Sequence, residues 1–298
     1  MKKFLCVCLL ALTALSVRAE LNVFATVPEW GALVKEIGGD KVTVFTATNA
    51  LQDPHRIEAK PSLLAQARRA QLVVAVGAEL EMAWLPVVIR NSGNAAIQLG
   101  SPGYFEAANF VTRLEIPLSL DRAHGDIHAG GNPHAHLDPR NFIKVGQALV
   151  IRMAELDPEN ASAYQAGFKA FAEKWQTAIT RWEREGAALK GLPVLVHHSS
   201  FTYLANWLGF TVVGSLEPKP GIEPTSNHLT ALVRRQQSTP GRMVLRAAYN
   251  QDGPSQWISE KAQIPAVLLP YTVGGTPEAK DLTGLFDDTL SRLLKALH

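Results

Sequence analysis

Short runs of β-branched and aliphatic residues alternate with helical patterns along most of the chain, and this alternation limits the fold more than any other feature. Strands that are separated by helices pair in parallel, because each helix carries the chain back across one face of the sheet. Four such runs lie in each half of the chain: residues 23–26, 42–45, 72–76 and 96–99, then 193–196, 211–214, 243–247 and 266–269. The pattern predicts an α/β protein of two lobes, each a small parallel sheet flanked by helices.

A long helical pattern lies between the two sets of strands. An Asp157-Pro158 pair provides an acidic N-cap with proline in the first turn, and no further proline occurs before residue 189. At 1.5 Å per residue, about 30 residues would form a rod of ~45 Å, long enough to run along both lobes. We therefore expect an N-terminal lobe over residues 20–156, one long rigid helix over 157–189 and a C-terminal lobe over 190–298. A long amphipathic helix inside one larger domain is the alternative.

The first residues have the pattern of an export signal. Lys2 and Lys3 precede a run of roughly 12 apolar residues, and the Val-Arg-Ala sequence at 17–19 is similar to a small-x-small cleavage site. A helix that spans a bilayer needs about 20 apolar residues, so a membrane anchor fits less well. The segment predicts a cleaved signal peptide over residues 1–19 and a mature protein in the periplasm.

Composition limits the chemistry of the mature chain. Both cysteines, Cys6 and Cys8, lie in the predicted signal peptide, so any metal must be held by nitrogen and oxygen ligands. Without Lys2, Lys3 and Arg18, 26 of the 29 basic residues remain against 27 acidic ones. This balance gives no basic surface for nucleic acid. The chain is long enough to fold around its own core, so a metal site is free to be functional.

Three of the nine histidines are candidate metal ligands. His55 follows an Asp-Pro pair, His134 follows an Asn-Pro pair just before a predicted helix, and His198 ends the apolar run 194–197. These positions are strand exits and helix starts, where parallel α/β sheets form binding crevices. Neutral imidazole binds zinc at ~2.0–2.1 Å, with its second nitrogen held by a hydrogen-bond acceptor. The alternative for each histidine alone is a surface or hydrogen-bonded role.

A series of short motifs runs in order through the mature chain: Gly38-Gly39-Asp40, Asp53-Pro54-His55, Glu79-Leu80-Glu81, Asn132-Pro133-His134, Leu137-Asp138-Pro139, Asp157-Pro158-Glu159-Asn160, His198-Ser199-Ser200-Phe201 and Ile222-Glu223-Pro224. In this combination the chain resembles the zinc and manganese family of periplasmic solute-binding proteins that serve ATP-binding-cassette (ABC) importers. The resemblance implies a monomeric protein without enzymatic activity, which captures a metal ion and delivers it to a membrane permease.

The resemblance also implies a ligand set. His55 and His134 would be the ligands from the first lobe, and His198 the first ligand from the second. Family members tuned to manganese usually have a carboxylate at the position of His198. The imidazole in this chain therefore favours Zn(II) as the transported ligand, in line with the preference of manganese for oxygen. The family often adds an aspartate after the last strand, but residues 269–275 contain no carboxylate. The fourth ligand is therefore left open among water, His136, Asp252 and a residue of the glycine-rich loop near residue 130.

Two histidines of that loop, His124 and His128, have two interpretations. They could collect zinc for the site, as the histidine-rich loops of relatives are thought to do, or belong to a solvated connector. His136 falls where the family commonly has tryptophan, which favours a place in the pocket wall over ligation.

Two other functions are compatible with three histidines. A zinc hydrolase would use the same ligands and a water, but the sequence has neither a His-Glu-x-x-His helix nor a GxSxG turn. A structural role would make zinc a staple of the fold, which removal of the metal would reveal by unfolding.

Overall fold

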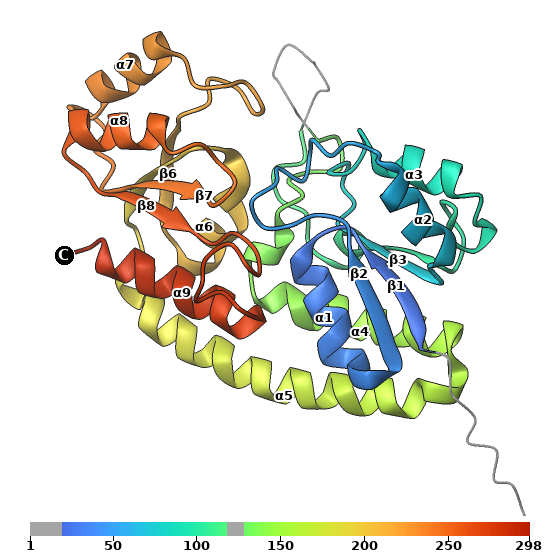
Figure 1. Ribbon diagram of the computed structural model, residues 1–298. Helices are drawn as coiled ribbons and strands as arrows, with labels where there is room; N and C mark the ends of the chain where they lie inside the picture. Colours follow the sequence, from blue (N-terminus) through green and yellow to red (C-terminus); the bar gives the residue numbers. More distant parts are fainter. Residues whose placement is uncertain (1–19, 118–127) are drawn as a thin grey trace, which may run out of the picture.

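The computed structural model describes residues 20–117 and 128–298, so the predicted signal peptide and His124 lie outside the described residues. Figure 1 shows two lobes side by side above one long helix. The first lobe is built on strands β1 (Leu21–Ala25), β2 (Val42–Thr46), β3 (Leu72–Ala75) and β4 (Tyr104–Glu106). The second is built on β5 (Pro193–Val196), β6 (Thr211–Ser215), β7 (Val244–Ala247) and β8 (Ala266–Leu269).

Both sheets are parallel throughout and share one strand order. The first sheet runs β2-β1-β3-β4 and the second β6-β5-β7-β8, so the second lobe repeats the topology of the first. In each sheet the chain first moves to one side of the starting strand and then to the other. Loops that leave the strand ends on either side of this reversal form a crevice, which is where open α/β sheets bind ligands. The predicted pair of parallel sheets is confirmed.

One predicted strand is wrong. Residues 96–99 do not pair in the sheet, because Asn94 caps a 3₁₀ turn, η2 (Ala95–Ile97), by accepting a hydrogen bond from the amide of Ala96. Ile97 is buried, but Leu99 is 78% exposed, so the segment has no continuous apolar face. The fourth strand is instead β4, whose three residues are too few to give a recognisable pattern.

Helices cover both faces of each sheet. In the first lobe, α1 (Pro28–Gly38) and α4 (Arg140–Leu156) pack on one face, and α2 (Pro61–Arg69) and α3 (Leu85–Ser92) on the other. In the second lobe, α6 (Thr202–Leu208) and α9 (Leu282–Lys295) lie opposite α7 (Ser226–Arg235) and α8 (Gly253–Ala262). Strand residues divide accordingly: Val74 faces α1 and α4, whereas its neighbours Val73 and Ala75 face α2 and α3.

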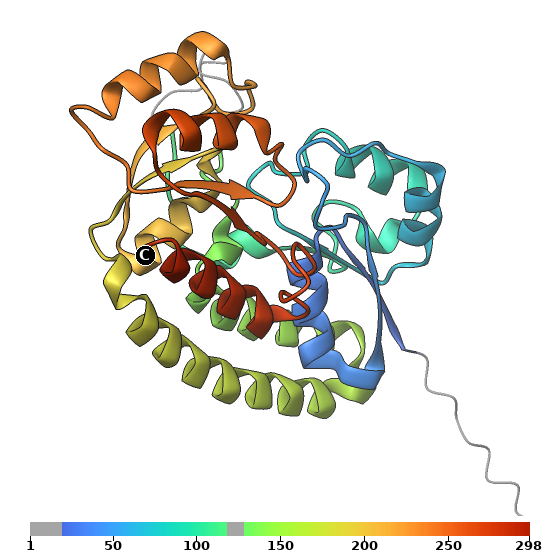
Figure 2. The same ribbon diagram turned by 60° about the vertical axis from the view of Figure 1, so that its left-hand side comes forward.

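The predicted long helix is α5 (Ala161–Glu185), with 3₁₀ turns η6 (Pro158–Asn160) before it and η7 (Gly186–Leu189) after it. Its 25 residues correspond to a rod of about 38 Å. Figures 1 and 2 show that α5 runs under both lobes, with α1, α4 and α9 above it. Its buried side chains form one helical stripe: Tyr164, Phe171, Trp175, Ala178, Ile179 and Trp182.

One apolar core extends through both lobes. Buried residues of β1, α4, α5, β5 and α9 belong to a single cluster. At its centre the ring of Trp175 lies 5.2 Å from that of Phe142 in α4 and 5.6 Å from that of Phe286 in α9, measured between centroids. Because these aromatic rings bridge the lobes, the two sheets share one packed interior.

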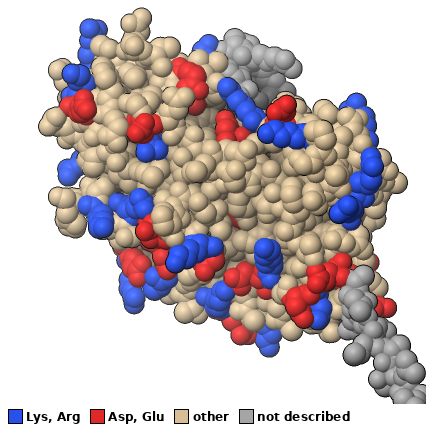
Figure 3. Space-filling view, viewed as in Figure 1, with Lys and Arg blue, Asp and Glu red and all other residues tan. Residues whose placement is uncertain are grey.

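The surface carries mixed charge. On the face drawn in Figure 3, lysine and arginine side chains are interspersed with aspartate and glutamate. Among the described residues, no helix combines the length and the apolar character needed to cross a membrane.

Candidate metal centre

The three candidate ligands come together between the lobes. His55 lies in the loop after β2, His134 in the segment between β4 and α4, and His198 directly after β5. All three positions follow the carboxyl ends of strands, so the parallel topology turns them toward one crevice. His134 is 1% exposed and His198 7%, while His55 is partly buried.

The three rings form a nearly equilateral triangle. The ring centroid of His55 lies 5.3 Å from that of His134 and 5.6 Å from that of His198, and the last two are 5.6 Å apart. Each pair meets edge-on, with interplanar angles of 71–79°. One nitrogen from each ring lies within 4.8 Å of the other two, and no other group of histidine and carboxylate ligands among the described residues is this compact.

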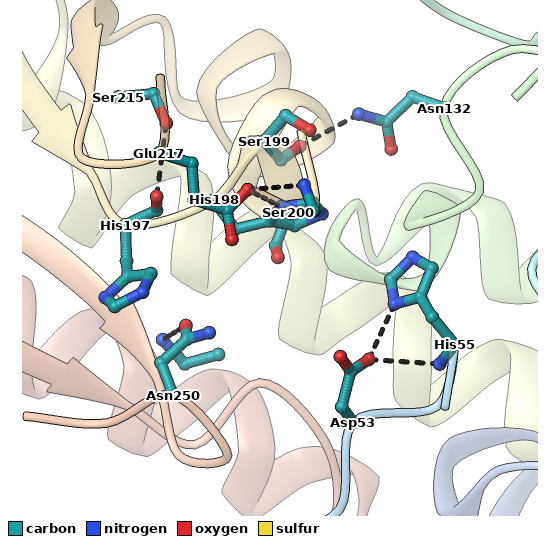
Figure 4. Close-up of polar contacts among 12 residues, drawn as sticks. Asp53, His55, Asn132, His197, His198, Ser199, Ser200, Ser215, Glu217 and Asn250 are labelled. Carbon is teal, nitrogen blue, oxygen red and sulfur yellow. Dashed lines mark hydrogen bonds and ion pairs between the residues drawn. The ribbon is translucent and has the colours of Figure 1, made fainter. Parts of the chain in front are cut away.

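Two of the rings are anchored by carboxylates of their own lobe. Nδ1 of His55 lies 2.7 Å from Oδ1 of Asp53, which also accepts the backbone N–H of His55. Nδ1 of His198 lies 2.7 Å from Oε2 of Glu217, which also accepts the N–H of Gly221. Figure 4 shows both pairs. A carboxylate at Nδ1 fixes the proton there and leaves Nε2 as the free ligand atom.

His134 is anchored differently. Its backbone N–H donates to Oδ1 of Asn132, and its Nδ1 lies 2.8 Å from the phenol oxygen of Tyr271 in the second lobe. In all three histidines, therefore, Nδ1 is occupied by a hydrogen-bond partner.

The remaining nitrogens are suited to a metal ion. Nε2 of His55 and Nε2 of His134 are buried and have no hydrogen-bond partner. A buried nitrogen without a partner costs free energy, which a bound cation would offset. Three nitrogens on one tetrahedral zinc ion would be about 3.4 Å apart, so rotamer adjustments of about an ångström would let all three bind one ion and leave a fourth position open.

The electrostatics keep His134 in the form that binds metal. Burial strongly disfavours a charge on His134, and neighbouring histidines add to this, so its pKa lies well below the ordinary value. Burial would raise the pKa of Asp53, but hydrogen bonds and charge from His55 outweigh it and lower the pKa. A neutral imidazole, as at His134, is the form that ligation requires.

The proposed alternatives for a fourth ligand occupy different places. His136 is buried, with Nε2 3.0 Å from the carbonyl oxygen of Tyr271 and Nδ1 3.2 Å from Oε1 of Glu29. Asp252 is exposed at the start of α8. His128 lies beside the site, where its ring stacks on that of His55 with centroids 5.3 Å apart.

Two cavities flank the triangle. One of about 190 Å³ is lined by His55, His197 and His198 together with Glu217 and Glu223. Burial lowers the pKa of His197 to about 4, and Figure 4 shows its ring turned toward Asn250, away from His55. The other, of about 280 Å³, is lined by His128, His134 and Glu115, among others. Each histidine of the triangle thus borders one of the two cavities.

The ring partners were not predicted as such. The spacing Asp-x-His could have indicated Asp53, since a carboxylate two residues before a histidine can reach Nδ1 through a tight turn. Glu217 lies 19 residues from His198 and Tyr271 lies 137 residues from His134, so only the fold brings them together.

The comparison with known families agrees with this geometry. The family model described as "ZnuA: Zinc-uptake complex component A periplasmic" matches residues 23–296. The chain belongs to this family. The resemblance stated from the motifs is therefore confirmed over almost the whole chain.

Relatives in the ZnuA family include metal-transport lipoproteins of streptococci. The metal ABC transporter substrate-binding lipoprotein SloC of Streptococcus mutans is 23% identical over 258 residues, which are 85% of this chain and 81% of that protein. The manganese ABC transporter substrate-binding lipoprotein ScaA of Streptococcus gordonii is 25% identical over 262 residues, 85% of this chain and 80% of that protein.

Solved structures share the fold. A crystal structure of ZnuA superposes with a TM-score of 0.76 at 22% identity and covers 94% of this chain and 100% of that one. The manganese-bound periplasmic metal binding protein of Candidatus Liberibacter asiaticus gives a TM-score of 0.74 at 17% identity, with coverage of 93% and 99%.

Family membership sets the general function. ZnuA-family proteins are substrate-binding subunits of ABC metal transporters and are not enzymes, so this chain binds a metal ion and acts with a membrane permease. The hydrolase considered from the sequence is thereby excluded. The relatives are described as periplasmic proteins or lipoproteins, which locates such proteins on the outer side of the cytoplasmic membrane.

Proposed function

We propose that this protein captures Zn(II) between its two lobes through His55, His134 and His198 and delivers it to the permease of an ABC importer. The observation that carries the proposal is the orientation of the three rings. Each Nδ1 has a hydrogen-bond partner, and the Nε2 atoms of His55 and His134 are buried without one. Such an arrangement is what a tetrahedral zinc site requires of its ligands.

Zinc is favoured over manganese by the donor set. The compact group contains three imidazoles and no carboxylate, and the two nearby carboxylates, Asp53 and Glu217, are engaged at the Nδ1 atoms. Imidazole is a good zinc ligand, whereas manganese prefers carboxylate, carbonyl and water oxygens. Manganese, the metal in the name of the ScaA relative, is therefore the second candidate cargo. For the fourth ligand of the zinc ion we propose water.

Export and lobe organisation complete the proposal. A signal peptide over residues 1–19 would direct the protein to the periplasm, where it would act as a monomer with lobes over 20–156 and 190–298. The shared aromatic core and α5 support a small tilt of the lobes in preference to a wide hinge motion. Release to the permease would then need only a small displacement of His198 from the other two ligands.

Elemental analysis of the purified mature protein, followed by zinc titration of the metal-free form against a chromophoric chelator, tests the proposal. We expect one zinc per chain and tight binding, with manganese bound far more weakly. The double variant His55→Ala/His198→Ala should lose high-affinity binding and keep its circular dichroism spectrum. The matched control is His298→Ala, which removes an exposed histidine at the chain end.

Three outcomes would contradict the proposal. The first is tight zinc binding by the double variant, because the ligands would then lie elsewhere. The second is a clear preference for manganese over zinc. The third is unfolding of the wild-type protein on metal removal, which would indicate a zinc staple.

A further inference from the structure

One ligand of the triangle is held from the opposite lobe. Tyr271 lies two residues after β8, and its phenol oxygen is 2.8 Å from Nδ1 of His134, which belongs to the first lobe. Tyr271 is 3% exposed, and its ring packs edge-on against both His134 and His136, with centroid distances of 5.7 Å and 4.8 Å. This contact spans the interface between the lobes.

The backbone of Tyr271 is held in place on the same interface. Its φ of +66° lies in the left-handed region, which residues other than glycine rarely adopt and which is frequent at functional sites. Its carbonyl oxygen lies 3.0 Å from Nε2 of His136, and the next residue, Thr272, donates to Oε2 of the buried Glu29 at 2.5 Å. First-lobe residues thus contact this turn at the phenol, at the carbonyl oxygen of Tyr271 and at the hydroxyl of Thr272.

The other two ring partners differ from Tyr271 in the lobe they belong to and in their hydrogen-bonding chemistry. Asp53 and Glu217 each belong to the lobe of the histidine that they hold. A carboxylate only accepts, so it fixes the proton on Nδ1, whereas a phenol can accept from Nδ1–H or donate to a bare Nδ1. His134 is therefore the ligand whose tautomer and orientation depend on contact with the second lobe.

We propose that Tyr271 is a positioning residue for the metal site, which aligns His134 only when the lobes are together and so links zinc affinity to lobe closure. The proposal rests on the proposed function. When Nε2 of His134 binds the metal, its ring proton is on Nδ1 and is donated to the phenol oxygen. Separation of the lobes would remove this acceptor and weaken the third ligand together with the second-lobe ligand His198.

The test is the affinity of Tyr271→Phe, which removes one oxygen and keeps the ring. Loss of such a partner of a metal-bound histidine typically lowers affinity 10–100-fold, and we expect zinc binding by the metal-free protein to weaken by this factor. The matched control is Tyr164→Phe, which deletes the hydroxyl of another buried tyrosine, one that donates to Asp157 far from the site. It should change zinc affinity less than threefold.

Proton NMR distinguishes positioning from a general effect on packing. In the zinc-loaded wild type, each ligand should give a protected, downfield Nδ1–H resonance, and that of His134 should show a nuclear Overhauser effect to the Tyr271 ring. Tyr271→Phe should lose only this resonance and keep those of His55 and His198. The wild-type signal is informative even if the variant does not fold.

Two results would overturn the proposal: a change in zinc affinity below threefold in Tyr271→Phe, or the absence of the Nδ1–H contact between His134 and Tyr271 in the loaded wild type. Neither would affect the proposed function, which depends on the loss of binding in the His55→Ala/His198→Ala double variant. If the double variant instead kept high-affinity zinc binding, the proposed metal site itself would be wrong.

Discussion

The side-chain amide of Asn132 donates a hydrogen bond to the backbone carbonyl of Ser199 over 2.9 Å, and so joins the loop before His134 to the loop after His198. Figure 4 shows this contact. The same amide uses its oxygen to accept the backbone N–H of His134 at 3.0 Å. Asn132 is 6% exposed, so its side chain is largely removed from water. One side chain therefore links the loops that carry two candidate ligands from different lobes.

Asn132→Ala should weaken zinc binding about tenfold, because loss of hydrogen bonds worth about 1.4 kcal/mol loosens the two ligand loops. Chelator competition on the metal-free variant measures this. The control is Asn109→Ala, whose amide contacts Glu106 in an exposed position and should leave the affinity within twofold. Equal affinities for the two variants would show that the inter-lobe bond does not position the ligands.

The fold was largely predictable because its signals are local. Strands such as β3, buried on both faces, give an uninterrupted apolar run, and α5 gives a helical stripe without proline. The fourth strand was missed because β4 has three residues and takes its stability from pairing with β3, whereas the apolar residues at 96–97 gave a stronger local signal. Pairing between segments that are distant in the chain cannot be recognised from a few consecutive residues.

The sequence indicates candidate ligands for the site, but not the residues that support them. Histidines at strand exits and helix starts are visible in the sequence, since loop position and chemistry are both local properties. The partners Glu217 and Tyr271 are ordinary polar and aromatic residues in the sequence, and only the packing of the lobes makes them part of the site. That His136 contacts Glu29 likewise follows from the tertiary fold.

Glu81 should make the metal-free protein less stable as the pH rises. Burial raises its pKa to about 7 from 4.5, despite hydrogen bonds from Thr26, Val76 and Gly77. Between these values the unfolded chain releases the proton and the folded chain keeps it, so stability falls as the pH increases and the loss is complete above 7. A shift of this size corresponds to about 3 kcal/mol.

Urea unfolding of the wild type and of Glu81→Gln at several pH values isolates this contribution. The side chain of the variant cannot ionise. Any effect of its amide on the free energy of unfolding is constant with pH, so the comparison uses only how that free energy changes with pH in each protein. We expect the wild type to lose about 3 kcal/mol relative to the variant between pH 4.5 and pH 7. Parallel curves would mean that the carboxyl group is ionised throughout this range.

Gly167 should be required where the long helix crosses α1. A Cβ atom at this position would lie 2.1 Å from the carbonyl oxygen of Ile37, and a backbone atom cannot move aside as a side chain can. Gly167→Ala should therefore destabilise the protein by about 2 kcal/mol, even though alanine favours the helix by about 1 kcal/mol. Gly253→Ala is the control, since nothing lies within 4 Å of its added Cβ atom. Similar urea midpoints for both variants would contradict this close helix contact.

Metal preference should follow the donor atom at position 198. Replacing His198 by glutamate alone would place two negatively charged carboxylates next to each other, because Oε2 of Glu217 lies 2.7 Å from the present Nδ1. In the double variant His198→Glu/Glu217→Gln, the amide at 217 can instead donate to the new carboxylate. Zinc affinity should fall more than manganese affinity, with their ratio lowered by about tenfold or more, because manganese prefers oxygen. Glu217→Gln alone keeps the three imidazoles. It should lower zinc affinity without changing the ratio of zinc to manganese affinity in this way. Paired zinc and manganese titrations measure both, and an unchanged ratio in the double variant would mean that His198 does not set the preference.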